Sequence, residues 1–579
     1  MHAAHEVMQT LDTDILILGA GGAGLLAALH AKQAEPELEV VIAVKGLLGK
    51  CGCTRMVQGG YNVALAPGDS VERHFMDTIE GGGWLNDQEL AWLLASGAPR
   101  CVRELENEIG CFFDRNPDGT IHQKAFAGQT FDRTVHKGDL TGIEIINRLA
   151  EQVWRRDVRR LEDHRALDLL PAADGSGLAG ALMLDMRSGD PLLVRARATL
   201  LATGGGPTMY RYHTPSGDKS CDGMAMALRA GLPLRDMEMV QFHPTGLLAS
   251  PDTRMTGTVL EEGLRGAGGW LTDSTLKRFM FDYDPRGERA TRDIVSRAIM
   301  DRIRRGHASP NGGVWLEMGH LGPDRVRREF KGMVERCADC GFDLAAGRVE
   351  VIPTAHYMMG GLMFAPDCTT PMRRLYAAGE DTGGVHGANR LGGNGVANST
   401  VFGGIAGDAM AAQLTGAEPL ADVDRDALEA ARARAFAPLG RRGGDIAAIR
   451  RALHDVMWDD VGILRSAAGL GRAGDVLDAL AAEIGSAGTG DAEPRYNLAW
   501  MDRLNLDNLV LVSRAICTAA AARRDSRGAH FREDYPEMSD LATSRYTVAR
   551  IADGRIAVET EPVAFSRIRP GETLLEAAE

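Results

Sequence analysis

Short apolar runs followed at once by small residues recur along the chain and mark its expected strands. Residues 15–18 are apolar throughout, the glycine-rich segment 19–24 follows them, and residues 25–33 have the composition of a helix. A further apolar run covers residues 40–44, and another at 200–201 leads into a Thr-Gly-Gly segment. Buried strands give continuous runs of this kind, so the pattern predicts an α/β fold built on a Rossmann-like sheet.

The glycines of the first loop have the spacing of a nucleotide-binding turn. Gly19, Gly21 and Gly24 form a Gly-x-Gly-x-x-Gly pattern between the expected strand and helix. Free amides at the start of that helix, together with its macrodipole, can hold a pyrophosphate. A tight structural turn is the alternative for such glycines taken alone. The next expected strand ends at Lys45, where an NAD enzyme usually has an acid for the ribose, and this counts against NAD.

Length, charge and cysteine content narrow the class of protein. A chain of 579 residues is too long for one core and predicts about two to four domains. The net charge of −14 argues against nucleic acid or an anionic membrane as a direct partner, and nine cysteines, an odd number, indicate reduced thiols. Residues 1–12 lack the basic and apolar parts of a leader, and no apolar run reaches membrane-spanning length. We therefore expect a cytoplasmic protein without direct membrane insertion, peripheral to a membrane only through a partner subunit.

Longer motifs are more specific than these short runs. Residues 353–361 read Pro-Thr-Ala-His-Tyr-Met-Met-Gly-Gly, and residues 384–394 read Gly-Val-His-Gly-Ala-Asn-Arg-Leu-Gly-Gly-Asn. Residues 241–246 read Gln-Phe-His-Pro-Thr-Gly, and residues 291–298 read Thr-Arg-Asp-Ile-Val-Ser-Arg-Ala. In this order the segments resemble the flavoprotein subunit of the succinate dehydrogenase and fumarate reductase family, of which L-aspartate oxidase is a relative. The resemblance covers roughly residues 12–565.

The resemblance implies FAD as the cofactor. Lys45 resembles the family's strand-end lysine, Asp222 precedes an alanine-rich helix as its FAD-contacting aspartate does, and Glu380 matches another FAD contact. Gln58-Gly59-Gly60 matches the loop on the flavin side, where glycine lets backbone amides approach the ring. The residues implied to line the cofactor are Gly19, Gly21, Gly24, Lys45, Cys53, Thr54, Gln58, Gly59, Gly60, Ala166, Thr203, Asp222, Glu380, Gly395 and Val396.

The resemblance also implies hydride transfer between flavin N5 and one carbon of a C–C bond, which interconverts a small carboxylate and its alkene, fumarate and succinate being the simplest pair. Arg390 would clamp a substrate carboxylate with the help of His243 and His356. Arg292 would shuttle the proton, although arginine is normally a poor acid or base and needs neighbouring cations and carboxylates for this role. The alternatives are structural histidines and an ordinary ion pair between Arg292 and Asp293 or another surface acid.

Three positions depart from the family pattern. Cys53 stands where close relatives carry the histidine that binds FAD covalently, so we expect a noncovalent flavin, which would favour alkene reduction. A thioether from Cys53 to FAD is the alternative. Glu261 stands where relatives have a substrate-binding threonine, so it is protonated, turns away, or meets a substrate without a carboxylate at that end. Ala267 replaces a family glutamate, so the proton relay to Arg292 would have one carboxylate fewer.

By analogy with the family, the chain divides into four parts. A discontinuous FAD-binding domain would cover residues 10–245 and 350–420, with an α+β capping domain at 246–349 inserted between its halves. A helical domain would follow at 421–520, and a small C-terminal domain at 521–579.

Cysteine placement bears on metals and on the electron partner. Cys337 and Cys340 have the spacing of a zinc or redox pair, but a second ligand pair is missing, so we expect structural thiols and no metal. No cysteine cluster suits an iron–sulfur centre in this chain. Electrons would then be exchanged with an iron–sulfur partner subunit, a soluble donor or oxygen.

Two other functions compete with a fumarate-type reaction. Amine oxidation of the L-aspartate oxidase kind is disfavoured by Met359 and by residues 529–534, which are closer to the dehydrogenase pattern. The other is a flavin-bearing electron-transfer subunit that acts on a non-dicarboxylate or has no chemistry of its own. The joint presence of His243, Arg292, His356 and Arg390 disfavours it.

Overall fold

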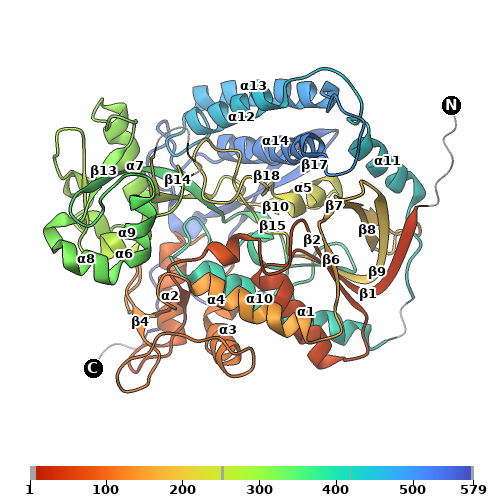
Figure 1. Ribbon diagram of the computed structural model, residues 1–579, viewed down its shortest axis with the longest axis horizontal. Helices are drawn as coiled ribbons and strands as arrows, with labels where there is room; N and C mark the ends of the chain where they lie inside the picture. Colours follow the sequence, from red (N-terminus) through yellow and green to blue (C-terminus); the bar gives the residue numbers. More distant parts are fainter. Residues whose placement is uncertain (1–7, 250–252, 254, 417–418, 576–579) are drawn as a thin grey trace.

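The computed structural model describes residues 8–249, 253, 255–416 and 419–575, so most of the N-terminal segment considered for a leader lies outside it (Figure 1). Its largest element is a seven-stranded sheet of order β6-β2-β1-β9-β8-β7, in which β16 also pairs with β9. β1 runs parallel to both β2 and β9, which confirms the predicted α/β fold with a Rossmann-like sheet. The strands are β1 (Gln9–Leu18), β2 (Val40–Val44), β6 (Arg159–Glu162), β7 (His164–Pro171), β8 (Leu178–Asp185), β9 (Pro191–Leu201) and β16 (Leu375–Ala377).

Helices cover both faces of this sheet. Ile15 belongs to a core shared with α1, α3, α4 and α10, whereas its neighbour Leu16 faces a core shared with α5 and α12 to α14. Glycine brings α1 and α10 close together, because a Cβ at Gly403 would lie 2.5 Å from the backbone oxygen of Ala23. The helices on the first face are α1 (Gly22–Ala34), α3 (Gln88–Asn107), α4 (Thr141–Trp154) and α10 (Asn394–Leu414).

A second sheet, the capping sheet, is antiparallel with the order β11-β14-β13-β12, and its helices form the left end of the molecule in Figure 1. β11 and β14 pair so that His243 lies opposite Thr354, two positions before His356. The elements are β11 (Val240–Leu247), β12 (Trp270–Thr272), β13 (Val314–Glu317), β14 (Arg348–Met358), α6 (Gly263–Gly266), α7 (Arg292–Arg304), α8 (Pro323–Glu329) and α9 (Lys331–Ala338).

The C-terminal part supplies helices and a hairpin. The hairpin β17–β18 extends a sheet of order β15-β10-β17-β18. The C-terminal elements are α11 (Arg425–Phe436), α12 (Ile446–Asp459), α13 (Ala467–Ser486), α14 (Leu498–Ala522), β17 (Arg545–Ala552) and β18 (Arg555–Pro562). Three elements from earlier in the chain lie with them: α5 (Asp222–Arg229), β10 (Leu234–Arg235) and β15 (Gly361–Leu362). The remaining elements include α2 (Val71–Gly81) and a small sheet of β3 (Tyr61–Asn62), β4 (Gln123–Lys124) and β5 (Thr134–Val135).

The predicted domain boundaries stay a prediction. β11 continues across the predicted boundary between residues 245 and 246, and β14 continues across the one between residues 349 and 350.

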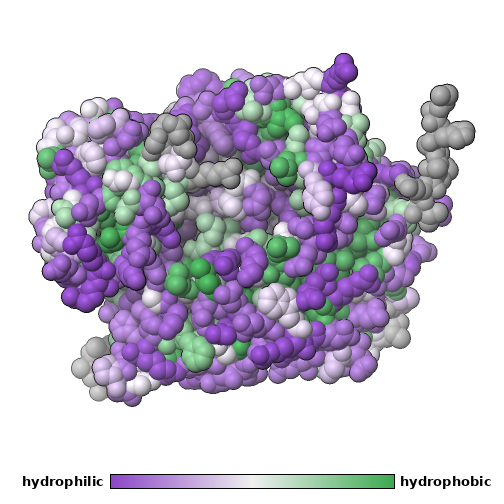
Figure 2. Space-filling view, in the orientation of Figure 1, coloured by the Kyte–Doolittle hydropathy of each residue, from purple (hydrophilic) through white to green (hydrophobic). Residues whose placement is uncertain are grey.

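The face shown in Figure 2 is largely hydrophilic, with apolar residues in small separate groups. Within the described ranges no helix has the length and apolar character needed to cross a membrane.

Candidate active site

One cavity brings together segments from the whole length of the chain. It runs from the loop between β1 and α1, past the ends of β2, β7 and β9, to β11, β14 and the N-terminus of α10. Every residue predicted to contact cofactor or substrate lines it, with the exception of Gly24. Gly24 serves the turn instead, because a Cβ there would lie 2.0 Å from the backbone oxygen of Gly19. Its glycine allows close packing of the turn, and its role as a cofactor contact stays a prediction.

The glycine turn presents a bare helix start to the cavity. Gly19 has φ +115°, and a Cβ at this position would lie 2.1 Å from the backbone oxygen of Ala202. α1 begins at Gly22, three residues earlier than expected, because the glycines of the turn form its first residues. The Gly22 amide donates to Thr54 Oγ1 at 3.2 Å, so Thr54 orients this end of the cavity. Free amides and the helix dipole together suit a pyrophosphate.

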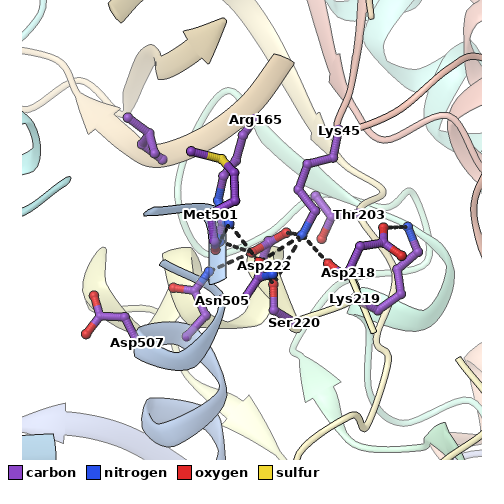
Figure 3. A network of polar contacts seen from close by, with 12 residues as sticks. Lys45, Arg165, Thr203, Asp218, Lys219, Ser220, Asp222, Met501, Asn505 and Asp507 are labelled. Atoms are coloured by element: carbon purple, nitrogen blue, oxygen red, sulfur yellow. Dashed lines mark hydrogen bonds and ion pairs between the residues drawn. The ribbon is translucent and has the colours of Figure 1, made fainter. Parts of the chain in front are cut away.

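Asp222 is the centre of a buried polar network at the same end of the cavity (Figure 3). Lys45 Nζ donates to Asp222 Oδ2 at 2.7 Å, and Arg165 Nη2 donates to Asp222 Oδ1 at 2.9 Å. The side-chain amides of two α14 residues complete it: Asn508 Nδ2 donates to Asp222 Oδ1 at 2.6 Å, and Asn505 Oδ1 accepts from Arg165 Nη1 at 2.7 Å. Burial alone would raise the pKa of Asp222, but Lys45 and Arg165 overcome it and hold that pKa far below the usual range.

Close backbone approach continues along the cavity. A Cβ at Gly59 would lie 2.4 Å from the Phe126 ring, and one at Gly205 would lie 2.6 Å from Glu380 Oε1. Glu380 accepts a hydrogen bond from the Met358 amide at 2.9 Å, and burial raises the pKa of this carboxyl to about 7. Glycine is needed at both positions because a side chain already lies against the backbone, and this stretch of the cavity wall therefore has no Cβ atoms.

Cys53 opens a short 3₁₀ turn, Cys53–Met56, on the cavity wall. Burial, with a further contribution from the nearby Glu380 carboxylate, raises the pKa of the Cys53 thiol to about 12. A thiol attacks as the thiolate, so this one is unreactive at neutral pH.

Two guanidinium groups converge on one amide oxygen at the other end of the cavity. Arg292 Nη1 and Arg390 Nη2 each donate to Gln241 Oε1 at 3.0 Å. Arg292 also donates from Nε and Nη2 to Glu262 Oε2, at 2.8 and 2.7 Å. The alternative pairing of Arg292 with Asp293 does not occur, since Asp293 pairs with Arg297 at 3.1 Å.

Gln241 and Glu262 contact Arg292 in the cavity, and neither was predicted as a site residue. Gln241 is the first residue of the 241–246 motif, and Glu262 directly follows Glu261. Burial favours the neutral form of Glu262, but the Arg292 and Arg265 guanidinium groups outweigh it and lower the pKa of this carboxyl. Glu262 is therefore an ionised acceptor beside Arg292.

The two histidines of the site lie side by side and are neutral. The His243 and His356 rings are 5.4 Å apart between centroids, and His356 Nδ1 lies 2.9 Å from the Thr214 hydroxyl. Burial and then the charge of Arg292 hold both histidine pKa values well below the usual range. Burial and Arg292 also lower the pKa of Arg390 to about 10, and its guanidinium stacks 4.4 Å from the Tyr357 ring centroid.

These features fit FAD. The cavity offers bare amides for a pyrophosphate, a buried carboxylate with cations beyond it, and a glycine-lined stretch that leads to a cationic pocket. Fold and site together define an FAD-dependent oxidoreductase. Among the described residues, no group of three or more His, Cys, Asp or Glu side chains is placed to hold a metal ion.

Comparison with known proteins specifies the class further. The FAD binding domain family matches residues 14–396, and the fumarate reductase flavoprotein C-terminal family matches residues 450–574. A fumarate reductase (CoM/CoB) subunit from Methanothermobacter marburgensis is 40% identical over 91% of this chain and 95% of its own. The fumarate reductase flavoprotein subunit of Escherichia coli is 33% identical, and the match covers 98% of this chain and 96% of the E. coli subunit. The solved FrdA chain of E. coli quinol fumarate reductase superposes with a TM-score of 0.90 at 33% identity, covering 98% of this chain and 99% of that one.

The chain therefore belongs to the fumarate reductase flavoprotein family. The predicted family, the FAD cofactor and an oxidoreductase acting on a CH–CH bond of the fumarate and succinate type are confirmed.

Proposed function

We propose that this protein reduces a small unsaturated carboxylate to its saturated form, with fumarate and succinate as the simplest pair, and that the reverse reaction uses the same residues. The convergence of Arg292 and Arg390 on Gln241, beside two neutral histidines, carries the proposal. FAD, when bound in this cavity, supplies the hydride chemistry.

Arg390 binds the substrate carboxylate through its planar guanidinium fork. Stacking on Tyr357 and the bond to Gln241 fix the plane of that fork. The neutral rings of His243 and His356 each present a nitrogen that donates without adding charge. These donors withdraw electron density from the double bond and stabilise the charge that develops on the carboxylate in the transition state.

Arg292 gives a proton to the second carbon of the double bond. Its guanidinium is buried, with 7% of the residue exposed, and two of its nitrogens donate to Glu262. Glu262 relays a proton back to the arginine after each turnover, because its ionised carboxylate can accept one and is hydrogen-bonded to the same group. Arg265 Nη2 lies 3.8 Å from Glu262 Oε1, and Arg265 Nη1 donates to the backbone oxygen of Glu288 at 2.6 Å.

Electrons reach the site from a second protein, either an iron–sulfur subunit or a soluble donor. The names of the relatives support this, because those proteins are described as subunits, one of them of an 8-methylmenaquinol:fumarate reductase in Wolinella succinogenes.

A substrate screen tests the proposal. The oxidation of a reduced dye by the holoenzyme would be followed with fumarate, mesaconate, longer alkenoic acids and aspartate. We expect turnover with at least one unsaturated acid and none with aspartate. Oxidation of aspartate by oxygen, without reduction of any alkene, would contradict it.

FAD is held noncovalently. Cys53 replaces the histidine of close relatives, and its thiol is protonated at neutral pH. Acid precipitation of the holoenzyme should leave the yellow colour in the supernatant, and Cys53→Ser should bind as much flavin as the parent. Flavin that remains in the pellet, or a flavin-bearing peptide that contains Cys53, would show a covalent bond.

A further inference from the structure

Glu261 is a buried carboxylate in the wall of the cationic pocket without a hydrogen-bond partner for one oxygen. The residue is 6% exposed and lines the same cavity as Arg292, Arg390 and the two histidines. Its Oε2 makes no hydrogen bond, and its nearest cation, Lys124 Nζ, lies at 3.6 Å, beyond hydrogen-bond distance. A carboxylate buried with so little hydrogen bonding needs a donor, and because the residue lines the cavity, a ligand there can supply one to the carboxyl group.

The positive charges near Glu261 do not fully compensate the negative charge of its carboxylate. Lys124 from β4 attracts the Glu261 carboxylate, and Asp139, just before α4, repels it. Arg336 of α9 also attracts it, but this guanidinium donates its hydrogen bond to the backbone oxygen of Val259 at 3.0 Å. Burial is the largest influence and raises the pKa of the Glu261 carboxyl, with Lys124 opposing that shift. The carboxylate of the next residue, Glu262, is already paired with Arg292.

A second substrate carboxylate would add a like charge beside Glu261. Arg390 and the histidines already bind the first carboxylate in the proposed function, so the far end of the substrate meets the Glu261 side of the pocket. Two carboxylates that share a site do not both stay ionised, and the pair retains one proton.

Building on the proposed function, we propose that Glu261 shares a hydrogen-bonded proton with the far end of the substrate, so that the substrate binds with one net negative charge. An unsaturated acid whose other end is an amide or a hydroxyl brings this hydrogen itself. A dicarboxylate such as fumarate takes up one proton from solvent, and that proton lies between Glu261 and the distal carboxyl group.

Proton counting tests this directly. Fumarate and its monoamide would be titrated into oxidised holoenzyme by calorimetry, in two buffers of different ionisation enthalpy at a pH of about 7–8, where free carboxylates are ionised. Both ligands carry the first carboxylate, so proton exchange at that end of the substrate is the same for each. The difference between the ligands therefore isolates the Glu261 end. We expect fumarate to take up about one proton more than the monoamide, and the ratio of their Kd values to change about tenfold per pH unit.

Variants separate this role from a general effect of charge. Glu261→Gln should abolish the difference in proton uptake, whereas the matched control Asp139→Asn, which removes a nearby charge that does not line the cavity, should keep it. Glu261→Thr should raise kcat/KM for fumarate at neutral pH by about 5- to 150-fold, the scale of relieving an unpaired buried polar group. Flavin content and Tm report whether each variant is folded.

The outcomes distinguish the two proposals. Equal proton uptake for both ligands in the parent enzyme, together with unchanged kcat/KM in Glu261→Thr, would overturn the role of Glu261 and leave the proposed function intact. Failure of the parent enzyme to reduce either ligand or any other unsaturated acid would count against the proposed function itself.

Discussion

Replacing Arg292 with alanine is expected to lower kcat by several orders of magnitude, of which the lost proton transfer alone accounts for about 10²- to 10⁴-fold. Arg292 is the buried group that joins the ionised Glu262 to the substrate end of the cavity. The variant should bind FAD as the parent does, because the nucleotide contacts lie at the other end. Steady-state oxidation of a reduced dye and the absorbance of released flavin measure the two properties.

The same helix offers a matched control for this experiment. Arg297 is the second arginine of the motif, and it pairs with Asp293 and donates to the Gly528 backbone oxygen at 2.7 Å, away from the cavity. Arg297→Ala should therefore leave kcat within a few-fold of the parent value. Near-normal turnover in Arg292→Ala, with fumarate or whichever unsaturated acid proves best, would show that another group carries the proton.

Replacing Asp222 with alanine should abolish FAD retention and lower stability. The change leaves Lys45 and Arg165 buried without their common carboxylate, and removal of one partner from a buried ion pair costs about 3–5 kcal/mol. The folded-state pKa of Asp222 is depressed, so its contribution is complete at neutral pH and is lost only as pH falls below about 4. Chemical unfolding at pH 7 and flavin absorbance of the purified protein measure the effect.

Asp218→Ala is the control for that variant. Asp218 is half-exposed and pairs with Lys219 at 3.0 Å, next to the same network. Only one partner of this pair is buried, so its loss should cost less stability than the loss of Asp222, whose two cationic partners are both buried. An Asp222→Ala protein that keeps its flavin and its unfolding midpoint would mean that Asp222 organises neither the site nor the core.

The sequence predicted strands and motifs better than it predicted the partners of buried charges. The strand expected at 40–44 has those bounds, because a fully apolar run has one stable place inside a parallel sheet. Gln241 and Glu262 escaped notice because their role depends on which guanidinium groups the fold brings to them. The contact of Asn508 with Asp222 is harder still to predict, because the two residues are 286 positions apart in the sequence. The residues next to Asn508 give no sign that this helical asparagine contacts a buried carboxylate.

Because Asn505 and Asn508 lie near the C-terminal end, the Asp222 network is completed late in the synthesis of this protein. Lys45, Arg165 and Asp222 leave the ribosome long before Asn505 and Asn508 do, so a growing chain holds an incomplete network at the nucleotide end of the cavity. Cofactor loading then belongs to the last stage of biogenesis, after α14 has docked. Any factor that inserts FAD would have to recognise a chain that is nearly finished, and a ribosome that stalls before α14 would release a protein that cannot retain flavin.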